Sequence, residues 1–201
     1  RMPCVRAYPR ESQEMVFDSH ARAFEFFGGV PRRGIYDNLK PAVDAIFVGR
    51  QRRYNRRFLV MCNHYLIEPT ACTPASGWEK GQVENQVGNV REWLFTPKVR
   101  CADLAELNAH LAARCLQLAR ERAHPEQSER KVIELWDEER ADLRAMPIPF
   151  DGYAEKSGLV STTCLVGFDR NRYSVESRYG RQVATVRAYA ERIVIVCGGE
   201  V

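Results

Sequence analysis

The chain of 201 residues has no long hydrophobic run, and its cysteines follow no regular spacing. A membrane-spanning helix needs about 18 or more apolar residues in succession, and no stretch approaches that length. The seven cysteines include no C-x-x-C pair. An odd count without a secretory signal favours reduced thiols in a cytoplasmic protein over a disulfide framework. Internal repeats are also absent, whereas 45% apolar residues suffice for a core.

The first residues, Arg1-Met2-Pro3-Cys4-Val5, contain neither an initiator methionine nor a targeting signal. We therefore expect the chain to be a fragment of a longer protein.

Cys62, His64 and Cys72 are the only grouping that resembles a zinc-binding cluster. Cys62 and His64 lie two positions apart in a stretch that is predicted to be helical, and residues two apart point to different sides of a helix. We interpret them as buried small hydrophobic side chains.

Positive charge is concentrated around Tyr54, although the formal net charge is only +4. The arginines within eight residues of sequence are Arg50, Arg52, Arg53, Arg56 and Arg57. Such a run forms either a solvated surface or a patch that binds phosphate groups, and the run itself leaves both interpretations open.

The N-terminal part alternates between short strands and helices. A strand is predicted to end at residues 5–8, and Ser12 can cap a helix that runs to Phe27, where Gly28 stops it. The elements predicted further on are a strand at 33–37, a helix at 55–65, a strand at 66–72, and helices at 79–95 and 103–122. This alternation is typical of an α/β domain with a mixed sheet.

The C-terminal part has a strand-like period. A charged helical segment at 129–145 and a proline-containing linker at 146–150 precede it. Short β-rich runs then follow at 162–166, 172–176, 182–188 and 192–197. The pattern predicts a small β-barrel, and divides the chain into 1–125, a helical segment with linker at 126–152, and 153–201.

Two carboxylates at the ends of predicted elements are the candidates for a metal site. Asp37 ends a strand, and Glu84 lies at the rim of the buried face of the helix at 79–95. Carboxylate oxygens bind Mg²⁺ or Mn²⁺, and two such ions about 4 Å apart support in-line phosphoryl transfer. Lys80 lies one turn before Glu84, where it can meet a phosphate, and Asn38 and Lys40 flank Asp37.

A purely structural interpretation of these residues stays open at this point. An Asp–Asn pair at the end of a strand often forms a turn or a helix cap. A Glu near the start of a helix often interacts with the helix dipole, and Glu79 competes with Glu84 for any role.

Three motifs together resemble a known family. They are Phe26-Phe27-Gly28-Gly29-Val30-Pro31, then Tyr36-Asp37-Asn38-Leu39-Lys40, then Gly77-Trp78-Glu79-Lys80-Gly81-Gln82-Val83-Glu84-Asn85. In order and adjacency they look like the integrase core of DDE transposases, and are most similar to IstA-like insertion-sequence transposases. The resemblance covers roughly residues 1–125, and 153–201 resemble the small β-barrel that follows the core in this group and in Mu-like transposases.

The resemblance implies an RNase H-like fold and metal-dependent transfer of a transposon 3′-OH into target DNA. Asp37 matches the second acid of the catalytic triad. Glu84 matches the third, because the family's glutamate closes a Gly-x-x-Glu run, here Gly81 to Glu84. The arginines around Tyr54, together with Asn38, Lys40, Lys80 and Arg91, are then expected to bind DNA.

The family's first Asp has no match in this chain. Asp18 lies on a predicted helix, too close to Asp37 to be that residue. The resemblance therefore implies that the first strand, its Asp and any N-terminal DNA-binding region lie upstream, and that this fragment alone is inactive. It further implies a homo-oligomer acting on DNA with an AAA+ ATPase helper, in the cytoplasm at the bacterial nucleoid.

Two alternatives remain. One is a non-catalytic DNA-binding or assembly module of the same fold, and the other is a nuclease of that fold. The C-terminal barrel, with its many arginines, is either a binding domain or a solvated spacer.

Overall fold

The first helix is built around aromatic residues at helical spacing. A computed structural model describes residues 1–36, 43–46, 52–71 and 88–201. Helix α1 (Gln13–Phe27) buries Phe17 and Phe24, which are 1% and 5% exposed. Gly28 ends the helix in the left-handed conformation (φ 76°), and its amide donates to the carbonyl of Glu25 at 3.2 Å. The predicted helix and its glycine stop are confirmed.

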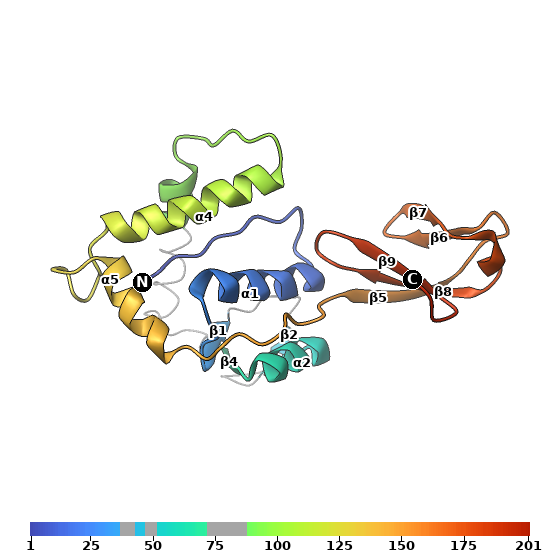
Figure 1. Cartoon of the computed structure of the whole chain (residues 1–201), viewed down its shortest axis with the longest axis horizontal. Coiled ribbons are helices and arrows are strands. Elements are labelled where there is room, and N and C mark those ends of the chain that lie inside the picture. Colours follow the sequence, from blue (N-terminus) through green and yellow to red (C-terminus); the bar gives the residue numbers. More distant parts are fainter. Residues whose placement is uncertain (37–42, 47–51, 72–87) are drawn as a thin grey trace.

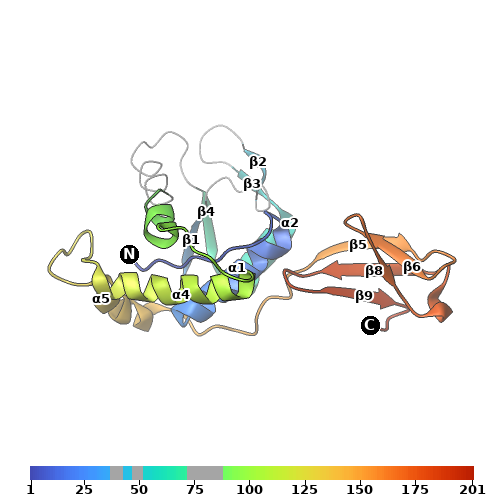
Figure 2. The same cartoon turned by 90° about the horizontal axis from the view of Figure 1, so that it is seen from above.

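Two short sheets lie beside α1 (Figures 1 and 2). Strands β1 (Arg33–Tyr36) and β4 (Glu68–Ala71) pair in parallel, with Ile35 opposite Thr70. Strands β2 (Val43–Ile46) and β3 (Arg52–Tyr54) pair antiparallel. Parallel pairing of strands that are separated by a helix is the arrangement expected of an α/β domain.

Helix α2 (Arg56–Tyr65) begins where the side chain of Asn55 accepts a hydrogen bond from the amide of Arg57 at 2.9 Å. Its buried face packs on α1, because Phe58 and Met61 join Phe17 and Phe24 in one apolar cluster. The predicted helix at 55–65 and the strand that follows it are confirmed.

A second apolar cluster lies on the other side of α1. Helix α4 (Leu104–Glu121) contributes Leu111 and Leu118, and the helical residues 88–95 contribute Leu94. Phe26 of α1 packs against this cluster. Figure 1 shows α4 along one side of α1 and α2 on the other, so α1 is the central helix of the N-terminal body.

Residues 5–8 are extended but belong to no sheet, so the predicted strand end there is wrong. The side chain of Asn108 on α4 takes the place of a neighbouring strand. Its Oδ1 accepts from the amide of Ala7 at 2.7 Å, and its Nδ2 donates to the carbonyl of Ala7 at 3.1 Å.

Helix α5 (Val132–Glu139) and the 3₁₀ turn η1 (Arg140–Asp142) are shorter than the predicted helical segment at 129–145. The chain leaves the helix because the backbone of Arg144 pairs with that of Val30, with hydrogen bonds of 2.8 and 3.0 Å. The predicted linker at 146–150 has no regular structure, and the irregular stretch continues to Tyr153, so residues 146–153 are called the linker below.

The C-terminal unit, here called the β-domain (residues 154–201), consists of five strands in two antiparallel sheets. They are β5 (Ala154–Leu159), β6 (Leu165–Phe168), β7 (Asn171–Ser174), β8 (Val183–Ala188) and β9 (Ile193–Cys197), with the 3₁₀ turn η2 (Ser177–Tyr179). One sheet has the order β5-β8-β9 and the other is β6-β7. Val166 and Val186 from the two sheets meet in one core, both 1% exposed.

The N-terminal unit (residues 1–145), here called the α/β body, and the β-domain are thus separate units with separate cores. Figures 1 and 2 show the β-domain at one end of an elongated molecule. The mixed α/β class and the all-β C-terminal unit are confirmed. Strand β5 was not among the predicted elements.

Candidate active site and DNA-binding residues

The end of β1 is the part of the predicted metal site that the structure describes. Tyr36, the last residue of β1, directly precedes Asp37. Its ring packs edge-on against Phe58, with centroids 5.0 Å apart, and lies 5.5 Å from the ring of His20. These aromatic contacts fix the end of the strand against α1 and α2.

Hydrogen bonds reinforce this packing. His20 Nδ1 lies 2.7 Å from the carbonyl oxygen of Val16, and His20 Nε2 lies 3.2 Å from the hydroxyl of Tyr36. Because a carbonyl only accepts, Nδ1 carries the proton, and Nε2 of the neutral ring accepts from the Tyr36 hydroxyl. Cys62, which is fully buried, belongs to the apolar cluster against which Tyr36 packs.

The pKa values of these groups move in the directions expected of buried groups. Burial lowers the pKa of His20, opposed in part by the hydrogen bond to Val16. Burial raises the pKa of Tyr36, and raises that of Cys62 to about 11. All three groups are therefore uncharged at neutral pH. The side chains that pack at the end of β1 thus carry no charge.

Both acids of the predicted metal site, Asp37 and Glu84, lie outside the described residues. So do Asn38, Lys40, Arg50 and Lys80, and the side chains of Arg52 and Arg53 on β3 are likewise not described. Within the described part of the chain, no group of three or more His, Cys, Asp and Glu side chains could hold a metal ion. The metal ligands therefore stay a prediction.

Arg56, Arg57 and Arg91 are the predicted DNA-binding residues whose side chains the structure describes. Arg56 and Arg91 are exposed on α2 and on the helix at 88–95. Arg57 instead faces the linker: its guanidinium lies 4.4 Å from the ring centroid of Tyr153, and it donates to the carbonyl of Asp151 at 3.5 Å. Arg57 thus has a structural contact in addition to its predicted role.

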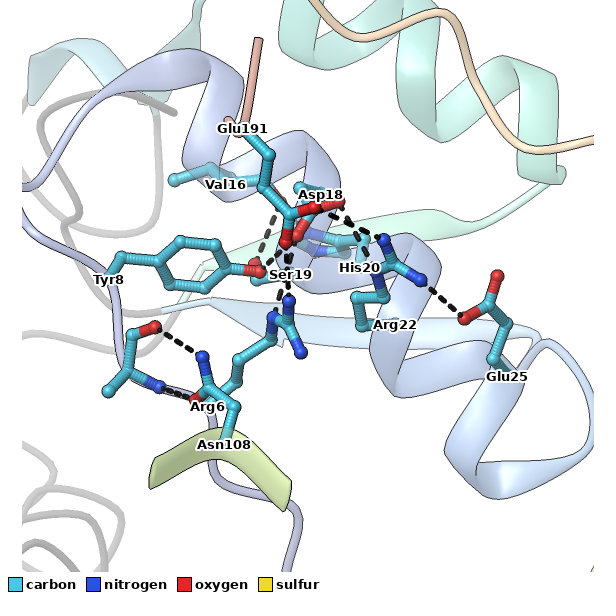
Figure 3. Close-up of polar contacts among 11 residues, drawn as sticks. Arg6, Tyr8, Val16, Asp18, Ser19, His20, Arg22, Glu25, Asn108 and Glu191 are labelled. Atoms are coloured by element: carbon cyan, nitrogen blue, oxygen red, sulfur yellow. Dashed lines mark hydrogen bonds and ion pairs between the residues drawn. The ribbon is translucent and has the colours of Figure 1, made fainter. Parts of the chain in front are cut away.

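Asp18 is a structural residue of α1, and its position on a helix is confirmed. It accepts a hydrogen bond from the hydroxyl of Tyr8 at 2.6 Å. The guanidinium groups of Arg6 and Arg22 lie 3.6 and 3.4 Å from its oxygens (Figure 3). Its carboxylate is therefore engaged by side chains of the α/β body.

Cys62 and His64 point in different directions, as their spacing predicts. Cys62 is fully buried beside Tyr36, whereas His64 is exposed and its Nε2 lies 2.7 Å from the carbonyl oxygen of Ile148. They share no site.

Aromatic side chains that stack with arginines were not predicted from the sequence. Tyr153 lies between Arg57 and Arg187, at 4.4 and 4.8 Å, and the ring of Tyr189 lies 5.6 Å from it. Arg192 stacks on Tyr189 at 4.5 Å. Only the last pair has a local signal in the sequence, because the two residues flank one tight turn.

The part of the chain that the structure describes contains no helix that is both long and apolar enough to cross a membrane.

Comparison with known proteins relates the chain to transposases. Residues 145–201 match the Mu transposase C-terminal domain. The chain is 43% identical over 196 residues to the transposase for insertion sequences IS1326/IS1353 of Pseudomonas aeruginosa, which covers 98% of this chain and 38% of that protein. These matches support the chain as a member of the DDE transposase and integrase superfamily.

Further relatives narrow the resemblance to insertion-sequence transposases. A transposase of Aminobacter aminovorans is 42% identical over 197 residues, covering 98% of this chain and 39% of that protein. The transposase for insertion sequence element IS21 of Pseudomonas aeruginosa is 29% identical over 189 residues, covering 91% and 47%. The chain thus spans about two-fifths of the length of the first two relatives.

Proposed function

We propose that this chain is the core and C-terminal portion of an insertion-sequence transposase that joins the element's 3′-OH ends to target DNA. The α/β body is then an RNase H-like core. Asp37 is the second acid of its metal-binding triad and Glu84 is the third, and an Asp upstream of Arg1 is the first.

The supporting observation is the position of Asp37. It directly follows β1, a strand that pairs in parallel with β4. The relatives that align with 98% of the chain are named transposases. Ligand-binding side chains in α/β sheets gather at the carboxyl ends of strands, so the position and the relatives favour the same chemistry.

The donor chemistry fits a hard divalent cation, because both proposed ligands are carboxylates. When bound, Mg²⁺ or Mn²⁺ ions would activate the attacking oxygen and stabilise the leaving oxygen. The chain's own residues would hold the ions through Asp37 and Glu84. Lys80, Asn38 and Lys40 would orient the DNA backbone beside them.

The substrate is DNA, and the remaining partners follow from the resemblance. We expect a homo-oligomer that brings two transposon ends together, assisted by an AAA+ ATPase, in the bacterial cytoplasm. Exposed Arg56 and Arg91, with the arginines that flank Tyr54, would contribute phosphate contacts that position the DNA.

Strand transfer by the complete protein tests this function. Asp37→Asn removes a proposed ligand charge and keeps the side-chain size, so product formation should fall by about 10³-fold or more while DNA binding persists. The assay follows the joining of labelled transposon ends to target DNA in Mg²⁺, beside a DNA-binding titration and a thermal melt. Near-normal product from a folded Asp37→Asn protein would instead favour a non-catalytic assembly module.

A further inference from the structure

The turn between β8 and β9 reaches across to the α/β body. Residues 189–192 form this turn, and the amide of Tyr189 donates to the carbonyl of Arg192 at 2.8 Å. Figure 3 shows Glu191 from this turn pointing at a cluster of side chains from the body. The tip of the β-domain is therefore in direct polar contact with α1 and the N-terminal segment.

The contact is ionic. Arg6 Nη2 lies 2.8 Å from one oxygen of Glu191, and Arg22 Nη2 lies 3.9 Å from the other. Both arginines also form ion pairs with Asp18, which accepts a hydrogen bond from the hydroxyl of Tyr8. The body thus holds the two guanidinium groups in place for the carboxylate of Glu191. A second pair, Arg10 with Asp169, joins the body to the β6–β7 turn.

Little apolar packing supports this contact. Each unit has its own core, and no cluster of buried apolar side chains extends from one unit into the other. Two hollows of about 500 and 620 Å³ lie between the turn and the body. One is lined by α1, the linker and residues 189–192, and the other by residues 9–15 and the β-domain. Polar contacts, chiefly the ion pairs of Glu191, rather than a shared apolar core, hold the turn against the body.

The linker, by contrast, is packed firmly onto the body. The amide of Phe150 donates to the hydroxyl of Tyr65 at 2.9 Å, and the ring of Phe150 meets that of Phe17 with centroids 5.1 Å apart. At Gly152, a Cβ atom would lie 2.4 Å from the Cβ of Phe17, so only glycine fits. Tyr153 then stacks between Arg57 of the body and Arg187 of the β-domain.

We propose that the β8–β9 turn is an ionic latch and that residues 152–153 are the pivot about which the β-domain swings when Glu191 leaves Arg6 and Arg22. The linker stays attached to the body in both states. The β-domain therefore has one fixed orientation relative to the α/β body while the latch is closed, and a range of orientations once the latch opens.

Ionic strength should control whether the latch is open or closed. Glu191 is 62% exposed, and exposed ion pairs are screened by salt, with a Debye length of about 10 Å at 0.1 M and about 3 Å at 1 M. The ion pairs of Glu191 therefore weaken as salt rises, whereas the aromatic contacts of the linker do not weaken in the same way. The turn also donates one hydrogen bond, from the hydroxyl of Tyr189 to Asp151 at 2.9 Å, which must break when the latch opens.

Small-angle X-ray scattering on the monodisperse chain tests the latch. At about 0.1 M NaCl, Glu191→Gln should give a larger radius of gyration and a longer maximum dimension than the parent chain. At about 1 M NaCl the parent should expand to match Glu191→Gln. If Glu191→Gln scatters like the parent at both salt concentrations, or if the parent does not expand, the latch is ruled out.

Glu200→Gln is the matched control. Glu200 is also 62% exposed and also lies 2.8 Å from an arginine, but its partner is Arg178 within the β-domain. This variant should scatter like the parent at low salt, and an expansion equal to that of Glu191→Gln would overturn the proposal. Gly152→Ala tests the pivot: displacement of the linker from Phe17 should expand the chain at both salt concentrations, and unchanged scattering would contradict the pivot.

Discussion

His20 shows how one partly buried polar residue fixes the end of a strand. Its neutral ring donates to Val16 within α1 and accepts from Tyr36 at the end of β1. The next residue after Tyr36 is Asp37, the proposed second acid. A neutral His20 therefore supports the strand end without placing a positive charge next to the carboxylate.

The lowered pKa of His20 predicts a pH dependence of stability. The unfolded chain binds the proton at the ordinary pKa of 6.5, whereas the folded protein binds it only at lower pH. The stabilisation from neutral His20 is complete above about pH 6.5 and is lost as the pH falls through the folded pKa. The free energy of unfolding, measured with urea, should be lower at about pH 5.5 than at about pH 7.5. In His20→Gln this decrease should be smaller, because the contribution of His20 is absent.

His110→Gln is the control for that experiment, because His110 is exposed on α4. It should keep the pH dependence of the parent chain. An equal loss of stability on acidification in the parent and in His20→Gln would show that His20 does not titrate in this way.

At the scale of elements, α4 organises the N-terminal segment. Asn108 gives Ala7 the two hydrogen bonds that a neighbouring strand would otherwise supply. The segment then carries Arg6 and Tyr8 to Asp18 on α1. One amide side chain on α4 thus positions the arginine that meets Glu191.

Asn108→Ala should lower the free energy of unfolding by about 1–2 kcal/mol, because the amide and the carbonyl of Ala7 both lose partly buried hydrogen bonds. Urea unfolding measures the loss, and amide hydrogen exchange should become faster at Ala7. The exposed neighbour His110→Ala should change stability by less than about 0.5 kcal/mol. Equal effects from the two variants would contradict the role of Asn108.

Helices were predicted well because their signals are local. The glycine after Phe27 lies next to the helix that it ends. The predicted cap, Ser12, takes the N-cap position, but its side chain makes no capping hydrogen bond. The errors involve distant partners. Residues 5–8 pair with a side chain about a hundred positions away, and β5 contains Glu155-Lys156-Ser157, which breaks the alternation expected of a strand.

At the scale of the whole molecule, the chain consists of two units joined by a packed linker and by the ion pairs of Glu191 and Asp169 with arginines of the body. The exposed arginines of the β-domain are Arg170, Arg172, Arg178, Arg181 and Arg192. Under the proposed function, Arg170, Arg172 and Arg181 would contact DNA phosphates, whereas Arg178 is paired with Glu176 and Glu200.

Deleting residues 153–201 from the complete protein should therefore weaken DNA binding or complex assembly. The slope of log affinity against log salt concentration should become shallower, because fewer phosphate contacts release counterions. Binding titrations over a range of salt, with light scattering for the oligomer, provide the measurement. Unchanged affinity, slope and oligomer size would show that the β-domain is only a spacer.

Around the proposed site, the sequence predicted only what has a local signal. The strand that ends just before Asp37 follows from the short apolar run there. The contact of Arg57 with Tyr153 could not be predicted, because residues nearly a hundred positions apart meet only after the linker has folded onto α1 and α2. For the same reason, the pairing of Glu191 with Arg6 and Arg22 has no signal in the sequence.

The most direct test of the proposed function compares Glu84→Gln with Glu79→Gln in the complete protein. Both substitutions remove one negative charge from the same predicted helix, five positions apart. Strand transfer in Mg²⁺ should fall by about 10³-fold or more for Glu84→Gln and change by less than about threefold for Glu79→Gln. Near-normal transfer by Glu84→Gln, or an equal loss in both variants, would contradict the assignment of Glu84 as a metal-binding acid.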